Sequence, residues 1–389
     1  MSEFERLIQP GAVAVNGDWM WLFDYNINAM FRMNLLSEKV EYVLSVQGED
    51  AYQRALFTDI FFYGNKVFLV ANSAAENVLI DLESMSQRKV HCRRRDMSTK
   101  TATPVQHGSK VYMFPKFLGD NIEVWDFEDE SVHEIQVDYS KVGQYIELRE
   151  LMWFGGVMEK EGFWLICGHS AKLVHIDKRG KVDIYPLDTV DKGFCAVSIK
   201  GDILYLLPEE GNELVQYDVL CNKSKVILDK INVFPNKCTY SYYRIIVIDE
   251  VMILVPGFER QVILINLAFQ EKKEWSVKER FCAYAMWKDK LFLFPELGKE
   301  WYILNLETQK MERYSCSFPS IRGGIPFYQY WMDDISKLAG IKPDYSELVC
   351  GVEQFLDDKG KNLTDDHSKK VHRINGDTIW KNLSSECLK

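Results

Sequence analysis

Short apolar runs recur along the chain, and each of them follows a polar turn. Seven such runs begin near residues 19, 67, 111, 163, 203, 251 and 291, so that successive starts lie 40 to 52 residues apart. A run of about five apolar residues between turn residues is typical of a buried β-strand. A nearly constant spacing of this length indicates one supersecondary unit that is repeated along the chain.

Each of these starts is followed 14 or 15 residues later by an apolar segment that ends in Asp or Asn. The seven positions are Asn34, Asp81, Asp126, Asp177, Asp218, Asn266 and Asn305. A short side-chain oxygen can accept a hydrogen bond from the backbone two residues on and thereby close a turn. We therefore expect these residues to form turns rather than to act as functional carboxylates.

Each repeat is expected to hold four short strands. In the second repeat the pattern predicts strands over residues 58–63, 66–71, 77–82 and 88–92, with Gly64-Asn65 as the hairpin turn between the first two. Four strands per repeat, arranged around a ring, are the signature of a β-propeller. The sequence therefore predicts an all-β fold, a seven-bladed β-propeller of four-stranded antiparallel blades.

The last part of the chain departs from this period. Residues 1–316 are expected to form the propeller, and residues 317–389 a closing segment with a small α/β appendage. Asp344 and Glu347 form a capping-box pattern before an amphipathic helix, which Gly360 ends. The appendage either latches onto the edge or base of the ring or docks a partner.

The repeat resembles that of the kelch-like β-propellers, which include many bacterial proteins, over about four-fifths of the chain. Kelch repeats usually carry a Gly-Gly pair at the end of the second strand, whereas this chain has such pairs only at residues 155–156 and 323–324. The Gly-His and Trp-Asp marks of WD40 repeats do not recur from repeat to repeat, and each occurs once, as Gly168-His169 and Trp125-Asp126. The resemblance implies the architecture and no particular activity.

Composition sharpens this picture in two respects. Aromatic residues make up 13% of the chain, which fits large side chains packed between neighbouring sheets. Lysine and arginine number 47 against 57 aspartates and glutamates, a formal net charge of −10. Sequence-independent binding of nucleic acid is disfavoured by this charge.

The compartment is predicted from what the sequence lacks. Residues 1–11 carry no apolar core of a secretory signal, and no run approaches the roughly 20 apolar residues of a membrane span. The nine cysteines are odd in number and form no Cys-x-x-Cys pair, which favours reduced thiols. We therefore expect a cytoplasmic protein without a membrane contact.

Motifs with a defined chemistry do not occur in the chain. It holds no phosphate-binding loop, no Gly-x-Gly-x-x-Gly and no Gly-x-Ser-x-Gly, and its seven histidines lack the spacing of metal ligands. No catalytic residue, no metal site and no cofactor is predicted.

Candidate binding residues lie where a propeller places its channel mouth. Arginines and tyrosines recur in the links that lead into the first strands, and His169 and Glu209 lie in loops after second strands. The candidates in the links are Arg54, Arg149, Tyr240, Tyr243, Arg244 and Arg322. Because arginine presents a planar fork to anions and tyrosine a stacking face, this set suits an anionic or glycan-like small ligand or an acidic peptide. Alternatively, the arginines pair with nearby carboxylates such as Asp50, Glu147 and Glu150.

Two classes of function remain open. The first is a cytoplasmic binding module that presents one face of the ring to a protein, a peptide or a small anionic ligand. The alternative is an enzyme, a hydrolase, lyase or isomerase acting on a sugar or anionic metabolite at the channel mouth. The enzyme would need a His/Glu/Arg cluster within hydrogen-bond reach.

Overall fold

A computed structural model describes most of the chain up to residue 316. The described ranges are 8–49, 53–92, 100–116, 119–140, 153–160, 162–167, 170–187, 193–208, 213–228, 242–256, 261–268, 271–277, 279–295 and 300–316. The predicted appendage from residue 317 onward lies outside the described residues. Within the described ranges, no segment forms an apolar helix of the length that a membrane crossing needs.

The described residues form 28 strands in seven four-stranded antiparallel sheets, the predicted blades. Blade 1 consists of β1 (Pro10–Asn16), β2 (Trp19–Asp24), β3 (Met30–Asn34) and β4 (Val40–Leu44). Blade 2 consists of β5 (Phe57–Tyr63), β6 (Lys66–Ala71), β7 (Asn77–Asp81) and β8 (Gln87–Val90). Blade 3 consists of β9 (Thr101–His107), β10 (Lys110–Pro115), β11 (Ile122–Asp126) and β12 (Ser131–Ile135). Blade 4 consists of β13 (Trp153–Met158), β14 (Gly162–Cys167), β15 (Ser170–Asp177) and β16 (Val182–Pro186).

The last three blades follow the same order. Blade 5 consists of β17 (Phe194–Lys200), β18 (Ile203–Pro208), β19 (Leu214–Asp218) and β20 (Lys223–Leu228). Blade 6 consists of β21 (Tyr242–Ile248), β22 (Val251–Pro256), β23 (Gln261–Asn266) and β24 (Lys272–Ser276). Blade 7 consists of β25 (Phe281–Trp287), β26 (Lys290–Pro295), β27 (Trp301–Asn305) and β28 (Lys310–Tyr314).

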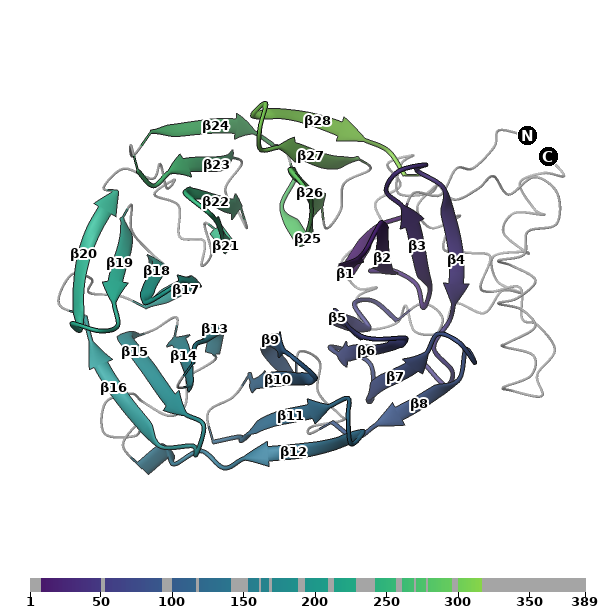
Figure 1. Ribbon diagram of the computed structural model, residues 1–389, viewed down its shortest axis with the longest axis horizontal. Coiled ribbons are helices and arrows are strands. Elements are labelled where there is room, and N and C mark those ends of the chain that lie inside the picture. The colour runs from purple at the N-terminus through teal and green to yellow at the C-terminus, as the bar shows by residue number, and fades with distance from the viewer. Residues whose placement is uncertain are drawn as a thin grey trace, which may run out of the picture. The chain divides into compact units, whose positions relative to one another are not determined.

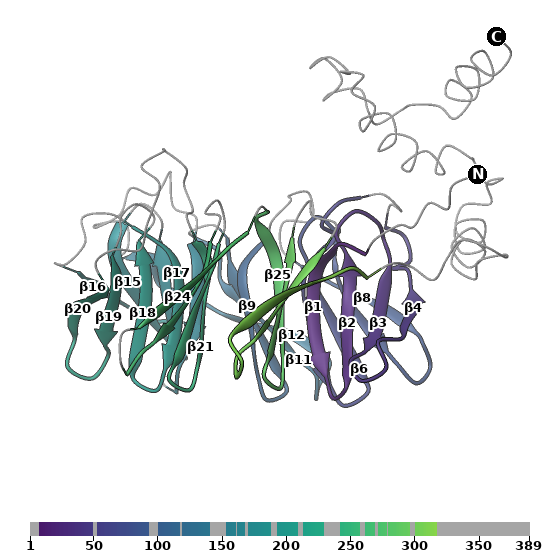
Figure 2. The same ribbon diagram turned by 90° about the horizontal axis from the view of Figure 1, so that it is seen from above.

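The blades stand side by side in a ring, with the first strand of each blade nearest the centre (Figure 1). Strand β1 contacts β5 on one side and β25 on the other, which closes the ring. Seen from the edge, the turns within the first and last hairpins of each blade gather at one rim, as Figure 2 shows. The first strands therefore line the central axis of the ring (Figure 1).

Ring closure uses the residues just before β1. The backbone N–H of Ile8 donates to the Cys316 carbonyl at 3.1 Å, and the indole N–H of Trp301 donates to the Ile8 carbonyl at 3.1 Å. The Cys282 thiol donates to the carbonyl of Pro10 at 3.2 Å. Blades 1 and 7 are thus joined by hydrogen bonds, while each blade keeps four strands that are consecutive in sequence.

The Asp and Asn residues at the ends of the third strands form the predicted turns. In six blades the side-chain oxygen accepts a hydrogen bond from the backbone two residues on: Asn34 (3.1 Å), Asp81 (3.0 Å), Asp126 (3.0 Å), Asp177 (2.8 Å), Asp218 (2.9 Å) and Asn266 (3.0 Å). In blade 7, Asn305 instead accepts from the backbone of Thr308, three residues on, at 2.6 Å. The turn interpretation is confirmed in every blade, with this one difference in reach.

Aromatic side chains pack between neighbouring blades, as their abundance predicts. Phe23 of blade 1 meets Phe57 of blade 2 with ring centroids 4.7 Å apart, and Phe114 of blade 3 meets Phe163 of blade 4 at 5.4 Å. All four rings are buried. Burial of such large rings between sheets is the main stabilising contribution that a single blade could not obtain alone.

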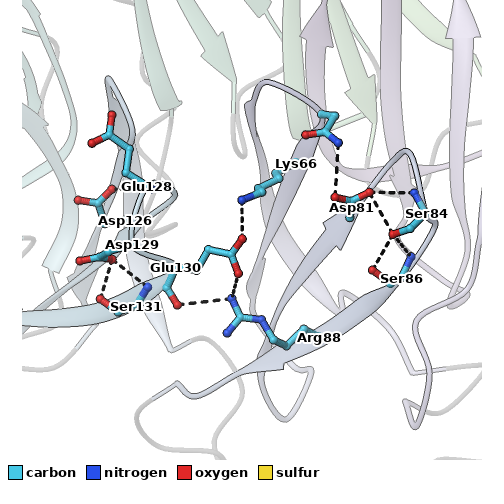
Figure 3. Close-up of polar contacts among 11 residues, drawn as sticks. Lys66, Asp81, Ser84, Ser86, Arg88, Asp126, Glu128, Asp129, Glu130 and Ser131 are labelled. Carbon is cyan, nitrogen blue, oxygen red and sulfur yellow. Dashed lines mark hydrogen bonds and ion pairs between the residues drawn. The ribbon is translucent and has the colours of Figure 1, made fainter.

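A polar bridge supplements the packing between blades 2 and 3. Figure 3 shows Glu130, in the last turn of blade 3, between Lys66 and Arg88 of blade 2. The guanidinium of Arg88 donates to the Glu130 carboxylate at 2.7 Å, and the Lys66 ammonium donates to its other oxygen. Because the three side chains are partly exposed, the bridge contributes little to stability by itself.

Candidate functional site

An extra residue interrupts the pairing of the first and second strands near the start of the first strand in every blade. In blade 2, for example, Phe57 pairs with Ala71 and Asp59 pairs with Val70, so that Thr58 has no partner. Similar register shifts occur in the other six blades. A β-bulge re-aims the side chains beside it. The residue after each bulge therefore has a comparable position around the axis.

This position after the bulge carries small residues in most blades and polar residues in three. It is occupied by Ala12, Asp59, Gly155, Ala196, Arg244 and Ala283, each paired with the penultimate residue of its second strand. In blade 3 the corresponding residue is Thr103, which precedes the paired residue Pro104. Alanine and glycine in four blades leave space at this level for longer side chains from the others.

Arg244 connects two of the polar positions. Its guanidinium Nη1 donates to Thr103 Oγ1 at 3.3 Å, although β21 and β9 belong to blades 6 and 3. These strands lie on different sides of the ring centre (Figure 1). The arginine side chain therefore reaches across the centre of the ring. Its length allows this because the residues at the same position in the neighbouring blades are small.

Asp59 is the third polar residue at this level. Its side chain is half-buried, and within the described residues no hydrogen bond or ion pair reaches its carboxyl group. Burial raises the pKa of Asp59 to about 7, because desolvation disfavours the charged carboxylate, while the positive charge of Arg244 opposes this shift. Asp59 and Arg244 thus interact electrostatically without forming an ion pair.

Two further groups share this environment. Burial raises the pKa of the Tyr284 hydroxyl, Arg244 opposes the shift, and the Asp59 carboxylate adds to it. Lys116 directly follows β10, and its pKa is lowered by burial and by the positive charge of Arg244. Arg244 is therefore within electrostatic range of a second cation, a carboxyl group and a phenol, contributed by Lys116, Asp59 and Tyr284.

This arrangement suits polar ligands that carry an anionic group. Two neighbouring cations attract an anionic group, and a poorly hydrated carboxyl group accepts donors. Within the described part of the chain, no group of three or more His, Cys, Asp or Glu residues could hold a metal ion.

The residues singled out from the sequence fall into different places. Arg244 lies at the ring centre, as described above. Arg54 is exposed and precedes β5, and the Ser73 hydroxyl donates to its backbone carbonyl at 2.6 Å. Tyr243 lies in β21, but the structure does not describe its side chain. Arg149, His169, Glu209, Tyr240 and Arg322 lie outside the described residues. The predicted channel mouth as a set therefore stays a prediction.

Sequence reasoning missed Asp59, Thr103, Lys116 and Tyr284. The sequence did contain a signal for Asp59 and Thr103. These two residues and Arg244 each lie four residues before the last residue of the first strand of their blade. Alignment of the first strands on that last residue puts these three polar residues in one column against alanine and glycine. Lys116 and Tyr284 lie outside this column, so no such alignment identifies them.

Comparison with known proteins supports the architecture and no specific family. No protein-family model and no curated protein sequence matches the chain. Among solved structures, a streptogramin B lyase is similar at 12% identity and a TM-score of 0.57, covering 76% of this chain and 94% of the lyase. Virginiamycin B lyase from Staphylococcus aureus is similar at 11% identity and a TM-score of 0.56, covering 76% and 96%. Sqt1 from Saccharomyces cerevisiae is similar at 8% identity and a TM-score of 0.56, covering 80% and 86%. At these identities the likeness shows the propeller fold alone.

Proposed function

We propose that this propeller is a binding protein that takes the anionic group of a small ligand or peptide at the centre of the ring. One observation carries the proposal: Arg244 reaches across the ring to Thr103, at 3.3 Å, and lies within electrostatic range of Lys116, whose pKa is lowered by burial and then by the charge of Arg244. Two partly buried cations therefore lie near each other. An anion bound between them would offset both their repulsion and their lost hydration.

The geometry around these cations supports a specific site rather than a merely basic surface. Arginine offers a planar fork with several donors, and lysine adds a point charge from a different blade. Ala196 and Ala283, at the register position of Arg244 in the blades on either side, leave its side chain room. On an acidic chain of net charge −10, such a local pair of cations is a distinct feature.

The free thiols support action in a reducing compartment such as the cytoplasm. Within the described residues, Cys92 and Cys316 are buried thiols that form no disulfide. Burial raises the pKa of Cys92 to about 11 and that of Cys316 to about 12, which keeps both thiols protonated and unreactive. A relationship to the kelch-like propellers is also part of this proposal, and it is based on the repeat alone.

An enzyme is the second candidate, and Asp59 is the observation that favours it. A carboxyl group with a pKa of about 7 can give up or accept a proton near neutral pH. The streptogramin B lyase shares the fold and shows that a propeller can carry a lyase. For this chain, Asp59 would be the acid–base group and Arg244 the group that holds an anionic substrate.

Native mass spectrometry and thermal unfolding test the binding function. We expect the purified protein to retain an anionic adduct, or to unfold at a higher temperature in phosphate, succinate or citrate than in chloride of equal ionic strength. Arg244→Gln should abolish this response. Arg179→Gln is the matched control, because it removes the same charge from an exposed turn of blade 4. A response that is absent in the native protein, or equal in both variants, would rule the proposal out.

A further inference from the structure

We propose that the ring-centre site recognises a small zwitterion, with the ligand's carboxylate or phosphate on Arg244 and its protonated amine on Asp59. This inference rests on the proposed binding function and deepens it by naming the ligand class. An amino acid is the simplest molecule with this pair of charges a few bonds apart.

The first argument is the placement of the two charges. Asp59 and Arg244 occupy the same register position in β5 and β21, in blades that lie across the ring from each other (Figure 1). Their side chains therefore start at one level of the axis and from opposite sides. Two opposite charges therefore lie on opposite sides of the ring centre at one level. Alanine or glycine occupies four of the other five positions at this level.

The second argument is that the two charges do not satisfy each other. Arg244 donates to Thr103 rather than to Asp59, and the described residues provide no hydrogen bond or ion pair to the Asp59 carboxyl. A half-buried carboxyl group has lost much of its hydration and needs donors in return. An ammonium group supplies three donors and a compensating charge. The Asp59 side of the ring centre therefore suits the amine of a ligand.

The third argument concerns selectivity. A ligand with anionic groups alone would gain from Arg244 and Lys116 but would be repelled by an ionised Asp59. A zwitterion meets a complementary charge at both ends. The Tyr284 hydroxyl, which also has no hydrogen bond within the described residues, lies in electrostatic range of Asp59 and Arg244 and can contact the ligand between its charges.

Isothermal titration calorimetry with aspartate and succinate tests this inference on the full chain. The two probes share a four-carbon dicarboxylate skeleton, and aspartate adds the ammonium group. We expect aspartate to bind the native protein about tenfold more tightly than succinate, a difference that corresponds to about 1.4 kcal/mol. Asp59→Asn should remove most of that preference, whereas Asp59→Glu should keep part of it. Asp202→Asn, in an exposed turn of blade 5, is the matched control and should keep all of it.

The outcomes separate the two proposals. If succinate binds at least as tightly as aspartate, or if Asp59→Asn keeps the preference, the zwitterion inference is wrong while the anion site stands. If neither probe binds the native protein at tens of millimolar, the binding function fails and the inference fails with it. The native comparison decides the matter even if an Asp59 variant does not fold.

Discussion

Phe68 and Trp125 stack face to face across the junction of blades 2 and 3, with ring centroids 5.0 Å apart and ring planes within 2° of parallel. Both side chains are buried. The Arg88 guanidinium lies 5.5 Å from the indole centroid, so blade 2 provides both an aromatic and a cationic contact to one tryptophan of blade 3. This junction lets the energetic role of inter-blade packing be measured at a single residue.

Replacing Trp125 with alanine should destabilise the propeller by about 3–5 kcal/mol, because the loss of a buried aromatic ring leaves a cavity between two blades. Urea unfolding followed by tryptophan fluorescence and circular dichroism measures the change. Leu220→Ala is the control, since Leu220 is 76% exposed and its truncation should change stability by less than about 0.5 kcal/mol. Similar losses in the two variants would contradict the role given to the inter-blade layer.

Replacing Gly64 with alanine should cost about 1–2 kcal/mol through backbone conformation alone. Gly64 has a φ of +61° in the hairpin between β5 and β6, and no atom lies within 4 Å of the position of an added Cβ. Gly155→Ala provides the contrast, because its backbone φ is not positive and the nearest atom, Val197 Cγ1, is 3.5 Å from an added Cβ. We expect that variant to stay within about 0.5 kcal/mol of the native protein. Equal melting temperatures for the two variants would refute the turn argument.

The turn aspartates predict how the stability of the protein changes at low pH. Hydrogen bonds from the backbone lower the pKa values of Asp81, Asp126, Asp177 and Asp218. A lowered folded-state pKa means that their contribution is present above the unfolded value of about 3.9 and is lost as pH falls through the folded-state value. Asparagine, which blades 1, 6 and 7 carry at this position, keeps the acceptor oxygen and does not titrate.

The fourfold Asp→Asn variant at these positions should therefore lose less stability than the native protein when the pH falls below about 4. Melting temperatures recorded from pH 6 downward measure the difference. Parallel curves for the two proteins would show that the turn carboxylates are not responsible for acid unfolding.

Asp59 should have the opposite pH dependence. Its folded-state pKa, about 7, lies above the unfolded value, so its ionisation costs stability above pH 7 and the cost disappears as pH falls toward 4. Asp59→Asn should therefore stabilise the protein at pH 8, on the order of 2 kcal/mol once partial solvent exposure is allowed for. The advantage should fall to about a quarter of this at pH 4.5, which is close to the unfolded pKa. Unfolding of both proteins at the two pH values tests this, and a pH-independent difference would argue against burial as the cause.

The repeat, the seven blades and the turn-forming residues could be predicted because their causes are local. Strand alternation and turn closure depend on residues a few positions apart, and Asn34 or Asp177 has its hydrogen-bond partner two residues away. The second strands of blades 3, 5, 6 and 7 likewise end at a proline, at Pro115, Pro208, Pro256 and Pro295. Proline provides no ladder donor wherever it stands, so this effect also needs no tertiary information.

The candidate site was only partly predictable. Arg244 was singled out because an arginine recurs in the links to the first strands, but its hydrogen-bond partner Thr103 is 141 residues away in sequence. Asp59 reads in isolation as one more polar residue in an alternating strand. Its significance depends on the bulge that sets its register and on the ring that brings β5, β9 and β21 around one axis.

The amino-acid sequence by itself thus determined the blades, their number and the turns that end them, because each of these follows from contacts within a hairpin. Tertiary structure alone decided which side chains meet at the centre. Ring closure through Ile8 and Cys316 brings distant first strands together, and the loss of hydration there gives Asp59 and Lys116 their altered pKa values. Burial is a property of the assembled ring, so no local pattern in the chain could have revealed it.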